Sequence, residues 1–354
     1  MKHGISLLPD CRPARRTPAS YFADIMRIAE IADDLGYGYV KMTEHYMKDY
    51  GGYCPSPLTY LAAVAVRTSQ IRLMTGGIQA SFHHPIQIAA QTAMVDAISS
   101  GRMDVGFARA WLPYEFEAFG VPLDESRARF ADTLLAVRRL WTEETVTEKG
   151  EFFAYQDVTS LPRPTQQPHP PVWVAAVRSR QSFSWIAEQG FGLLVTPPPK
   201  LDELIRTAEM VQVYLETFAD AHGQRGAQPR VALSVPLYVA PTDDEAWATA
   251  GPALREYLEV WGEAADSWSG ASSVDYPSYG AIGEAMRHLD LADLRRAGTA
   301  VVGSPRTALE QIAELRKLLS VDTFLWQVDF GGQTLATMEP SVRLFASTVI
   351  PELG

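Results

Sequence analysis

Short apolar runs alternate with amphipathic helical patterns along almost the whole chain, and this alternation restricts the fold more than any other feature. The eight strand-like runs are, in order, ISLL (5–8), YVKMT (39–43), IRLMTGG (71–77), MDVGFA (103–108), PVWVAA (171–176), GLLVT (192–196), RVALSVPLYVA (230–240) and TFLWQVDF (323–330). Eight strand-helix units in succession predict an α/β protein with a single (β/α)8 TIM barrel and insertions, with an open doubly wound sheet as the second possibility.

The segments between these runs carry helix signals. Thr17-Pro18 is an N-cap followed by proline at the first helical position. Apolar residues recur at helical spacing at Phe130, Leu134, Val137 and Trp141. The segment GEFFAY predicts a small hairpin, and the Gly-, Ser- and Tyr-rich stretch from 262 to about 282 predicts a mobile loop. Residues 1–354 are therefore expected to form one barrel domain.

In such a barrel, functional groups collect at the C-terminal ends of the strands. Chemically distinctive residues follow five of the eight runs: Glu44-His45, Gly76-Gly77, Arg109, the segment VRSRQS (177–182) and Asp329. This coincidence predicts a functional site at that end of the barrel.

Arg109 stands directly before Ala110 and Trp111, and two explanations are open for it. A structural ion pair is the ordinary one, and a bound anion is the other. Arg178, Ser179 and Ser182 follow the fifth run and start a helix, where free N–H groups and the helix dipole attract phosphate. Serine capping beside a solvated Arg178 explains the same three residues.

The other strand ends also allow two interpretations each. Glu44 and His45 form either a satisfied core pair or a site where the histidine moves a proton. Gly76-Gly77 is either an ordinary loop start or a close approach of the backbone to a flat ligand. The adjacent pair His83-His84 lacks a third ligand at suitable spacing, so no metal site is predicted.

Composition excludes several classes of function. A net charge of −11 gives no basic footprint for nucleic acid or an anionic membrane. The two cysteines, Cys11 and Cys54, are too few for a disulfide framework, and neither a signal-peptide core nor a membrane-length apolar run is visible. A cytoplasmic protein is expected. The sequence contains no Gly-x-Ser-x-Gly, Walker or GxGxxG motif, and this argues against the commonest hydrolases, NTPases and Rossmann dinucleotide-binding proteins.

An ordered series of segments resembles the bacterial luciferase-like family of flavin-dependent monooxygenases. These segments are TEHYMKDYGG, TGGIQASFHHPIQIAAQTAMVDAISSGRMDVGFARAW, FGVPLDESRARFADTLLAVRRLW, PPVWVAA and SVRLFASTVIPEL. The resemblance implies a TIM barrel that binds a reduced flavin at its C-terminal face. Tyr46 and Ala108 replace a histidine and a cysteine of luciferases, so the chain is not classed as a luciferase.

The resemblance also implies roles for individual residues. Arg109 would hold the phosphate of FMN, helped by Arg127, Ser179 and Ser182, whereas Arg178 has no clean counterpart in the family. Gly76 and Gly77 would lie against the isoalloxazine ring, at a position where luciferases have a non-prolyl cis peptide. Glu44 would neighbour the flavin, and His45 would match the catalytic histidine.

The function implied is a two-component monooxygenase, an oxidoreductase that receives reduced FMN (FMNH2) from a separate flavin reductase. It would activate O2 as a peroxyflavin and oxygenate a small organic substrate. At the strand ends, Trp111, Tyr46 and Trp326 fit either an apolar, aromatic or secondary-metabolite substrate or simple packing in the core. The alternatives are an F420-dependent oxidoreductase that transfers hydride and a non-catalytic flavin-binding subunit. The family implies a homodimer.

Overall fold

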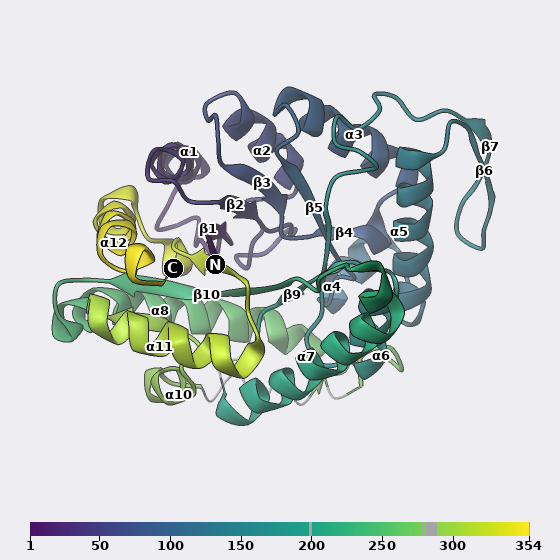
Figure 1. The fold of residues 1–354 in the computed structure, drawn as a ribbon. Coiled ribbons are helices and arrows are strands. Elements are labelled where there is room, and N and C mark those ends of the chain that lie inside the picture. The colour runs from purple at the N-terminus through teal and green to yellow at the C-terminus, as the bar shows by residue number, and fades with distance from the viewer. Residues whose placement is uncertain (198–199, 278, 281–288, 354) are drawn as a thin grey trace.

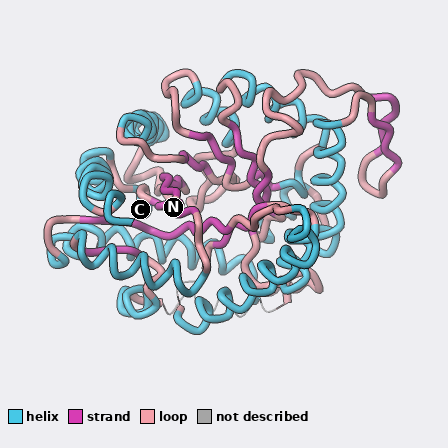
Figure 2. Tube along the Cα trace, in the orientation of Figure 1, coloured by secondary structure: helices cyan, strands magenta, loops and turns pink. Residues whose placement is uncertain are grey.

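The strands of the computed structural model, which describes residues 1–197, 200–277, 279–280 and 289–353, close into a parallel barrel (Figures 1 and 2). Within these residues the barrel strands are, in order around the ring, β1 (Lys2–Leu7), β2 (Tyr39–Met42), β3 (Arg72–Thr75), β5 (Met103–Ala108), β8 (Val172–Ala175), β9 (Gly192–Val195), β10 (Val231–Val239) and β12 (Thr323–Gln327). Pairing of β9 with β10, β10 with β12 and β12 with β1 closes the ring. The predicted (β/α)8 barrel is confirmed.

Helices surround the barrel as an outer layer (Figure 2). They are α1 (Pro18–Asp34), α2 (Pro57–Ala65), α3 (Pro85–Ile98), α4 (Pro113–Phe119), α5 (Ser126–Thr142), α6 (Arg180–Glu188), α7 (Leu201–His222), α8 (Asp243–Ala265), α10 (Leu291–Ala297), α11 (Pro305–Leu319), α12 (Leu335–Thr348) and α13 (Ile350–Leu353). The remaining elements are the short strands β4 (Ile78–Gln79), β6 (Val146–Lys149), β7 (Ala154–Val158) and β11 (Val301–Gly303), and the 3-10 turns η1 (Ala80–Phe82), η2 (Leu123–Glu125), η3 (Gly223–Arg225), η4 (Asp266–Trp268) and η5 (Phe330–Gly332).

Local signals account for several of these elements. Thr17 caps α1 by accepting a hydrogen bond from the backbone N–H of Ser20, and Pro18 opens the helix as predicted. The apolar stripe on α5 is buried against the sheet. The antiparallel pair β6 and β7 forms the expected hairpin, which projects from the barrel (Figure 1).

Side chains alternate across each strand, and this decides which residues enter the barrel. An apolar layer from six strands fills its interior: Tyr39, Met74, Trp173, Leu194, Ala232 and Leu325. Lys41 stands two residues after Tyr39 and is buried beside the hydroxyls of Ser6 and Ser234. The interior therefore changes from apolar to polar along the strands.

The same alternation decides between the two interpretations of Trp326 in favour of the core. Trp326 is fully buried, and its ring stacks on Phe324 at 4.8 Å and meets Phe345 of α12 edge-on. It therefore packs between the sheet and the helices, away from the barrel mouth, because the neighbouring Leu325 takes the inward position.

Asp329 follows β12 as predicted but is sealed in the core. Its carboxylate accepts hydrogen bonds from the backbone N–H of Leu8 at 3.1 Å and the hydroxyl of Tyr21 at 2.7 Å. Burial raises its pKa to about 7, and burial together with Asp329 raises the pKa of nearby Asp10. A buried carboxyl group that holds a proton so readily favours the folded state at low pH.

We predict that Asp329→Asn flattens the pH dependence of folding. The folded protein retains a proton on Asp329 that the unfolded chain loses near pH 4, so this contribution falls as the pH rises from about 4 to 7. The wild-type free energy of unfolding, minus that of the variant, should be about 3 kcal/mol larger at pH 5 than at pH 8. Urea unfolding of both proteins at pH 5 and pH 8 measures this quantity. If the difference between wild type and variant is the same at both pH values, the raised pKa of Asp329 is contradicted.

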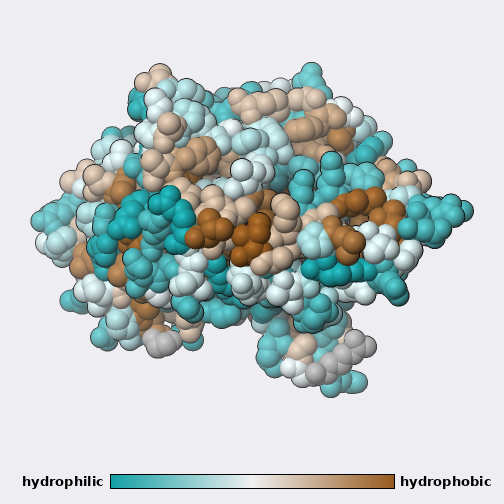
Figure 3. Space-filling model, turned by 90° about the horizontal axis from the view of Figure 1, so that it is seen from above, coloured by the Kyte–Doolittle hydropathy of each residue, from teal (hydrophilic) through white to brown (hydrophobic). Residues whose placement is uncertain are grey.

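Hydrophilic residues cover most of the face shown in Figure 3, where hydrophobic residues form smaller groups. Within the described ranges, every helix is too short or too polar to cross a membrane.

Candidate functional site

A cavity of about 1000 Å³ lies at the C-terminal ends of the strands. This volume is at the upper end of the range for ligand pockets. All nine residues that the sequence predicted for the site line it: Glu44, His45, Gly76, Gly77, Arg109, Arg127, Arg178, Ser179 and Ser182. Parallel strands bring them together because their C-terminal ends meet on one face of the barrel.

Two arginines and a helix start surround the carboxylate of Asp275. Its Oδ2 accepts hydrogen bonds from the Ser126 hydroxyl at 3.1 Å and the Arg127 backbone N–H at 3.0 Å. Nε of Arg127 lies 3.3 Å from Oδ1, and Nη1 of Arg109 lies 3.9 Å from Oδ2. We call Arg109, Ser126 and Arg127 the anion cradle. Arg109 directly follows β5, and Ser126 and Arg127 are the first two residues of α5. The sequence analysis did not identify Asp275 as their partner.

Arg109 therefore has an internal ion pair, the ordinary explanation that the sequence left open. Its guanidinium also lies over the ring of Tyr276 at 4.1 Å and donates to the Asp275 carbonyl at 2.9 Å. Nη1 is buried without a hydrogen-bond partner among the described residues. The cradle thus binds one carboxylate and still has an unused donor.

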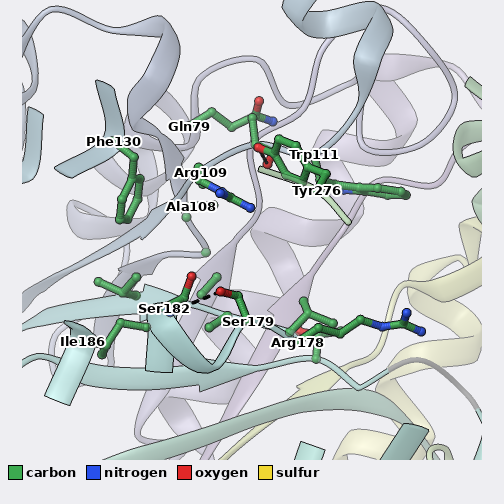
Figure 4. Close-up of a pocket in the computed structure, with 18 of the residues that line it drawn as sticks. Gln79, Ala108, Arg109, Trp111, Phe130, Arg178, Ser179, Ser182, Ile186 and Tyr276 are labelled. Carbon is green, nitrogen blue, oxygen red and sulfur yellow. Dashed lines mark hydrogen bonds between the residues drawn. The ribbon is translucent and has the colours of Figure 1, made fainter. Parts of the chain in front are cut away.

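The start of α6 lies next to the cradle (Figure 4). Ser179 is the N-cap and accepts from the N–H of Ser182 at 3.4 Å, while Arg127 donates to the Ser182 hydroxyl at 3.1 Å. The guanidinium of Arg178 points away from these serines and pairs with Glu203 at 2.7 Å. Of the five residues predicted to bind phosphate, Arg109, Arg127, Ser179 and Ser182 therefore lie together, whereas Arg178 points elsewhere.

Gly76 and Gly77 are joined by a cis peptide bond, as the family resemblance implied. A Cβ atom on Gly76 would come within 2.1 Å of the Lys41 side chain, and one on Gly77 within 2.6 Å of the Phe107 backbone. Protein atoms therefore fill the space that side chains would need here. Burial lowers the pKa of Lys41 to about 8. A lysine at an inward position of a strand was a signal that the sequence reasoning missed.

Glu44 is buried at the cavity wall. Its Oε1 accepts from the Tyr46 hydroxyl at 2.7 Å and lies 2.6 Å from Nε2 of His83. Burial by itself would lower the pKa of His83, but the hydrogen bond and charge of Glu44 outweigh it and raise the pKa. His83 and Glu44 thus form a hydrogen-bonded pair, and His83 joins the site through Glu44.

His45 is held by groups that the sequence did not single out. Its Nδ1 lies 3.1 Å from Oε1 of the fully buried Glu115 and 3.0 Å from the Gln79 amide. Glu115 also accepts from the Tyr46 backbone N–H at 2.9 Å. The amide nitrogen of Gln79 can only donate, so in the tautomer with the proton on Nδ1, His45 bonds to Glu115 alone and leaves Nε2 able to accept a proton. The sequence feature that could have pointed to Glu115 is its position as an acidic residue in the first turn of α4.

The predicted mobile loop, about 262–282, is partly helical, since 262–265 complete α8 and 266–268 form η4. Positions 278, 281 and 282 lie outside the described residues. Tyr276 is 3% exposed and donates to the Ala110 carbonyl at 2.8 Å. This part of the loop is packed onto the end of β5.

Comparison with known proteins matches residues 1–322 to the family model described as luciferase-like monooxygenase. The oxygenase component of the flavin-dependent trigonelline monooxygenase of Acinetobacter baylyi is 31% identical over 252 residues, which are 70% of this chain and 68% of that protein. The crystal structure of monooxygenase RslO1 from Streptomyces bottropensis is 36% identical and covers 100% of both chains with a TM-score of 0.84.

A third similarity concerns the fold alone. The oxygenating constituent of 3,6-diketocamphane monooxygenase from Pseudomonas putida, a type II Baeyer-Villiger monooxygenase in complex with FMN, has a TM-score of 0.80 at 21% identity. The alignment covers 99% of this chain and 98% of that one.

Proposed function

The chain belongs to the luciferase-like monooxygenase family, and from this premise we propose that it is the oxygenase component of a two-component system. It binds reduced FMN that a separate reductase supplies, and with O2 it oxygenates a small organic substrate. We propose further that residues 1–354 act as one barrel domain and form a homodimer.

The observation that carries this proposal is the anion held in the cradle. Arg109, Ser126 and Arg127 surround the carboxylate of Asp275 with one hydroxyl, one backbone N–H and two guanidinium groups. A phosphate monoester requires the same donors, so the carboxylate serves as a stand-in for it. The unused Nη1 of Arg109 supplies a further donor for a group with more oxygens.

The remaining residues fit a bound flavin. Ser179 and Ser182 border the cradle and extend its donors, and Gly76 and Gly77 line the cavity where a flat ring can approach the backbone. Reduced flavin supplies the electrons that activate O2, and the protein orients it and excludes water.

His45 is assigned the proton transfer. Glu115 holds its Nδ1, and the ring lines the cavity, so Nε2 can exchange a proton with a bound molecule. Glu44 lies at the same wall and is hydrogen-bonded to His83 at 2.6 Å. We propose that this pair keeps the wall beside the flavin polar and close to neutral.

The F420 alternative needs more free cations, because that cofactor has a longer polyanionic tail. Arg178 and Arg180 were the residues that kept this alternative open. Arg178 pairs with Glu203 at 2.7 Å, although Glu203 is shared with Arg206 at 3.2 Å, and Arg180 is exposed and does not line the cavity. Arg178 borders the cavity, and we place it at the edge of the cofactor site. The donors of the anion cradle suit a single phosphate, and this favours FMN.

Anaerobic titration with reduced FMN and reduced F420 in parallel tests the proposal. We expect reduced FMN to bind more tightly, and the loaded protein to consume O2 and oxygenate a substrate. Tighter binding of F420 with hydride transfer and no O2 consumption contradicts it. Flavin binding without turnover across a panel of aromatic and terpenoid substrates supports the non-catalytic subunit.

A further inference from the structure

The cavity has a second end whose chemistry differs from that of the anion cradle. Aromatic side chains from four separate parts of the chain line it: Tyr50 after β2, Trp111 after β5, Tyr257 and Trp261 on α8, and Tyr279. They belong to or pack against one hydrophobic cluster that includes Leu8 at the end of β1. Within the described ranges, no lysine or arginine lies over the ring of any of these five residues.

The rings are arranged at angles to one another. Tyr50 meets Trp111 edge-to-face at 5.8 Å and 90°, and Trp111 meets Tyr279 at 6.4 Å and 51°. Tyr50 also lies 4.9 Å from the ring of His45, which connects this end to the group proposed to move a proton. Trp111 and Tyr50 are only partly buried, so their rings are not sealed in the core. Such a wall provides both faces and edges for another flat ring.

Two hydroxyl groups on this wall are free to bind a ligand. The hydroxyls of Tyr50 and Tyr257 make no hydrogen bond within the described ranges, although both residues line the cavity. Burial raises the pKa of both tyrosines, so the groups stay protonated and can donate. A polar hydrogen in apolar surroundings is costly to leave unpaired, and an oxygen atom on a ligand would satisfy it.

We propose that this aromatic end is the substrate subsite, and that its substrate is a neutral, planar, multi-ring aromatic compound with a phenol or ketone oxygen. The proposal rests on the proposed function, because it assigns the flavin to the other end of the same cavity. The rings of Trp111 and Tyr50 contact the substrate rings, and the tyrosine hydroxyls bind its oxygen. A linear aliphatic compound without an oxygen atom would make neither the ring contacts nor the hydrogen bonds to the tyrosine hydroxyls.

Equilibrium dialysis of the cofactor-free protein tests the proposal with three probes: 2-naphthol, naphthalene and decan-1-ol. We expect 2-naphthol to bind most tightly. Trp111→Leu should weaken 2-naphthol and naphthalene alike, about 2- to 12-fold, because it removes an aromatic contact. The double variant Tyr50→Phe/Tyr257→Phe should weaken 2-naphthol by a similar factor and leave naphthalene unchanged, because it removes only hydroxyls.

Naphthalene is thus the matched control for the hydroxyls, and thermal melting verifies that each variant folds. Equal affinities for decan-1-ol and 2-naphthol, or equal losses for both aromatic probes in the tyrosine variant, overturn the proposal. Saturating reduced FMN should not displace 2-naphthol, and displacement would show that the probe had occupied the flavin end. If the protein binds 2-naphthol but not reduced FMN, the proposed function is refuted and the aromatic subsite stands. If it binds reduced FMN but not 2-naphthol, the subsite alone is refuted.

Discussion

Arg109→Ala should weaken the binding of reduced FMN about 10- to 150-fold. Charge-assisted hydrogen bonds contribute roughly 1.5–3 kcal/mol each, and loss of one produces this range. The effect should be at the upper end, because the variant leaves the negative charge of Asp275 beside the incoming phosphate with one cation fewer. Anaerobic fluorescence titration of wild type and variant measures it.

Arg129→Ala is the matched control for that experiment. Arg129 lies on the same helix as Arg127 but pairs with Glu125 and packs over Phe152, and it does not line the cavity. Its loss should change the affinity for FMN less than twofold. Equal affinities for wild type and Arg109→Ala would end the assignment of the cradle to the phosphate.

Asp275→Ala should act in the opposite direction and strengthen binding of reduced FMN about 10-fold. The carboxylate occupies donors that the phosphate needs, so the bound phosphate must first displace it. Removing a competing anion recovers the energy of breaking those contacts, on the order of 1–2 kcal/mol. The association rate should rise as well, and stopped-flow mixing under anaerobic conditions measures both quantities.

A second acidic residue separates loss of charge from loosening of the loop. Asp124 also lines the cavity and holds the same loop by accepting hydrogen bonds from Ser273 and from the backbone N–H of Val274, but within the described residues no hydrogen bond joins it to the cradle arginines. Asp124→Ala should leave FMN affinity nearly unchanged, whereas Asp275→Asn should reproduce most of the gain. An equal gain in the Asp124 and Asp275 variants would mean that the loop acts as a cover and that Asp275 is no competitor.

The barrel and the location of its site could be predicted because both depend on local patterns. Short apolar runs indicated which segments form strands, and apolar residues at 3.6-residue spacing indicated which form helices. Once the strands were parallel, residues that followed them had to meet on one face. All nine predicted residues therefore line one cavity, although no pair among Glu44, Arg109 and Ser179 is close in sequence.

Partners from distant segments could not be predicted in this way. Asp275 meets Arg127 across 148 positions, and Glu115 meets His45 across 70. Nothing in the local pattern around Asp275 differs from that of an ordinary polar loop. The inward or outward direction of Trp326 depended on strand register, which a run of consecutive apolar residues leaves open.

By itself the sequence determined the barrel, the family resemblance and the group of polar residues at the strand ends, because each follows from spacing along the chain. Only the tertiary structure decided that Asp275 fills the cradle, that Arg178 pairs with Glu203 and that Lys41 lies under Gly76. The reason is physical: electrostatic and steric contacts depend on separation in space, and the loops that bring these groups together carry no periodic signal.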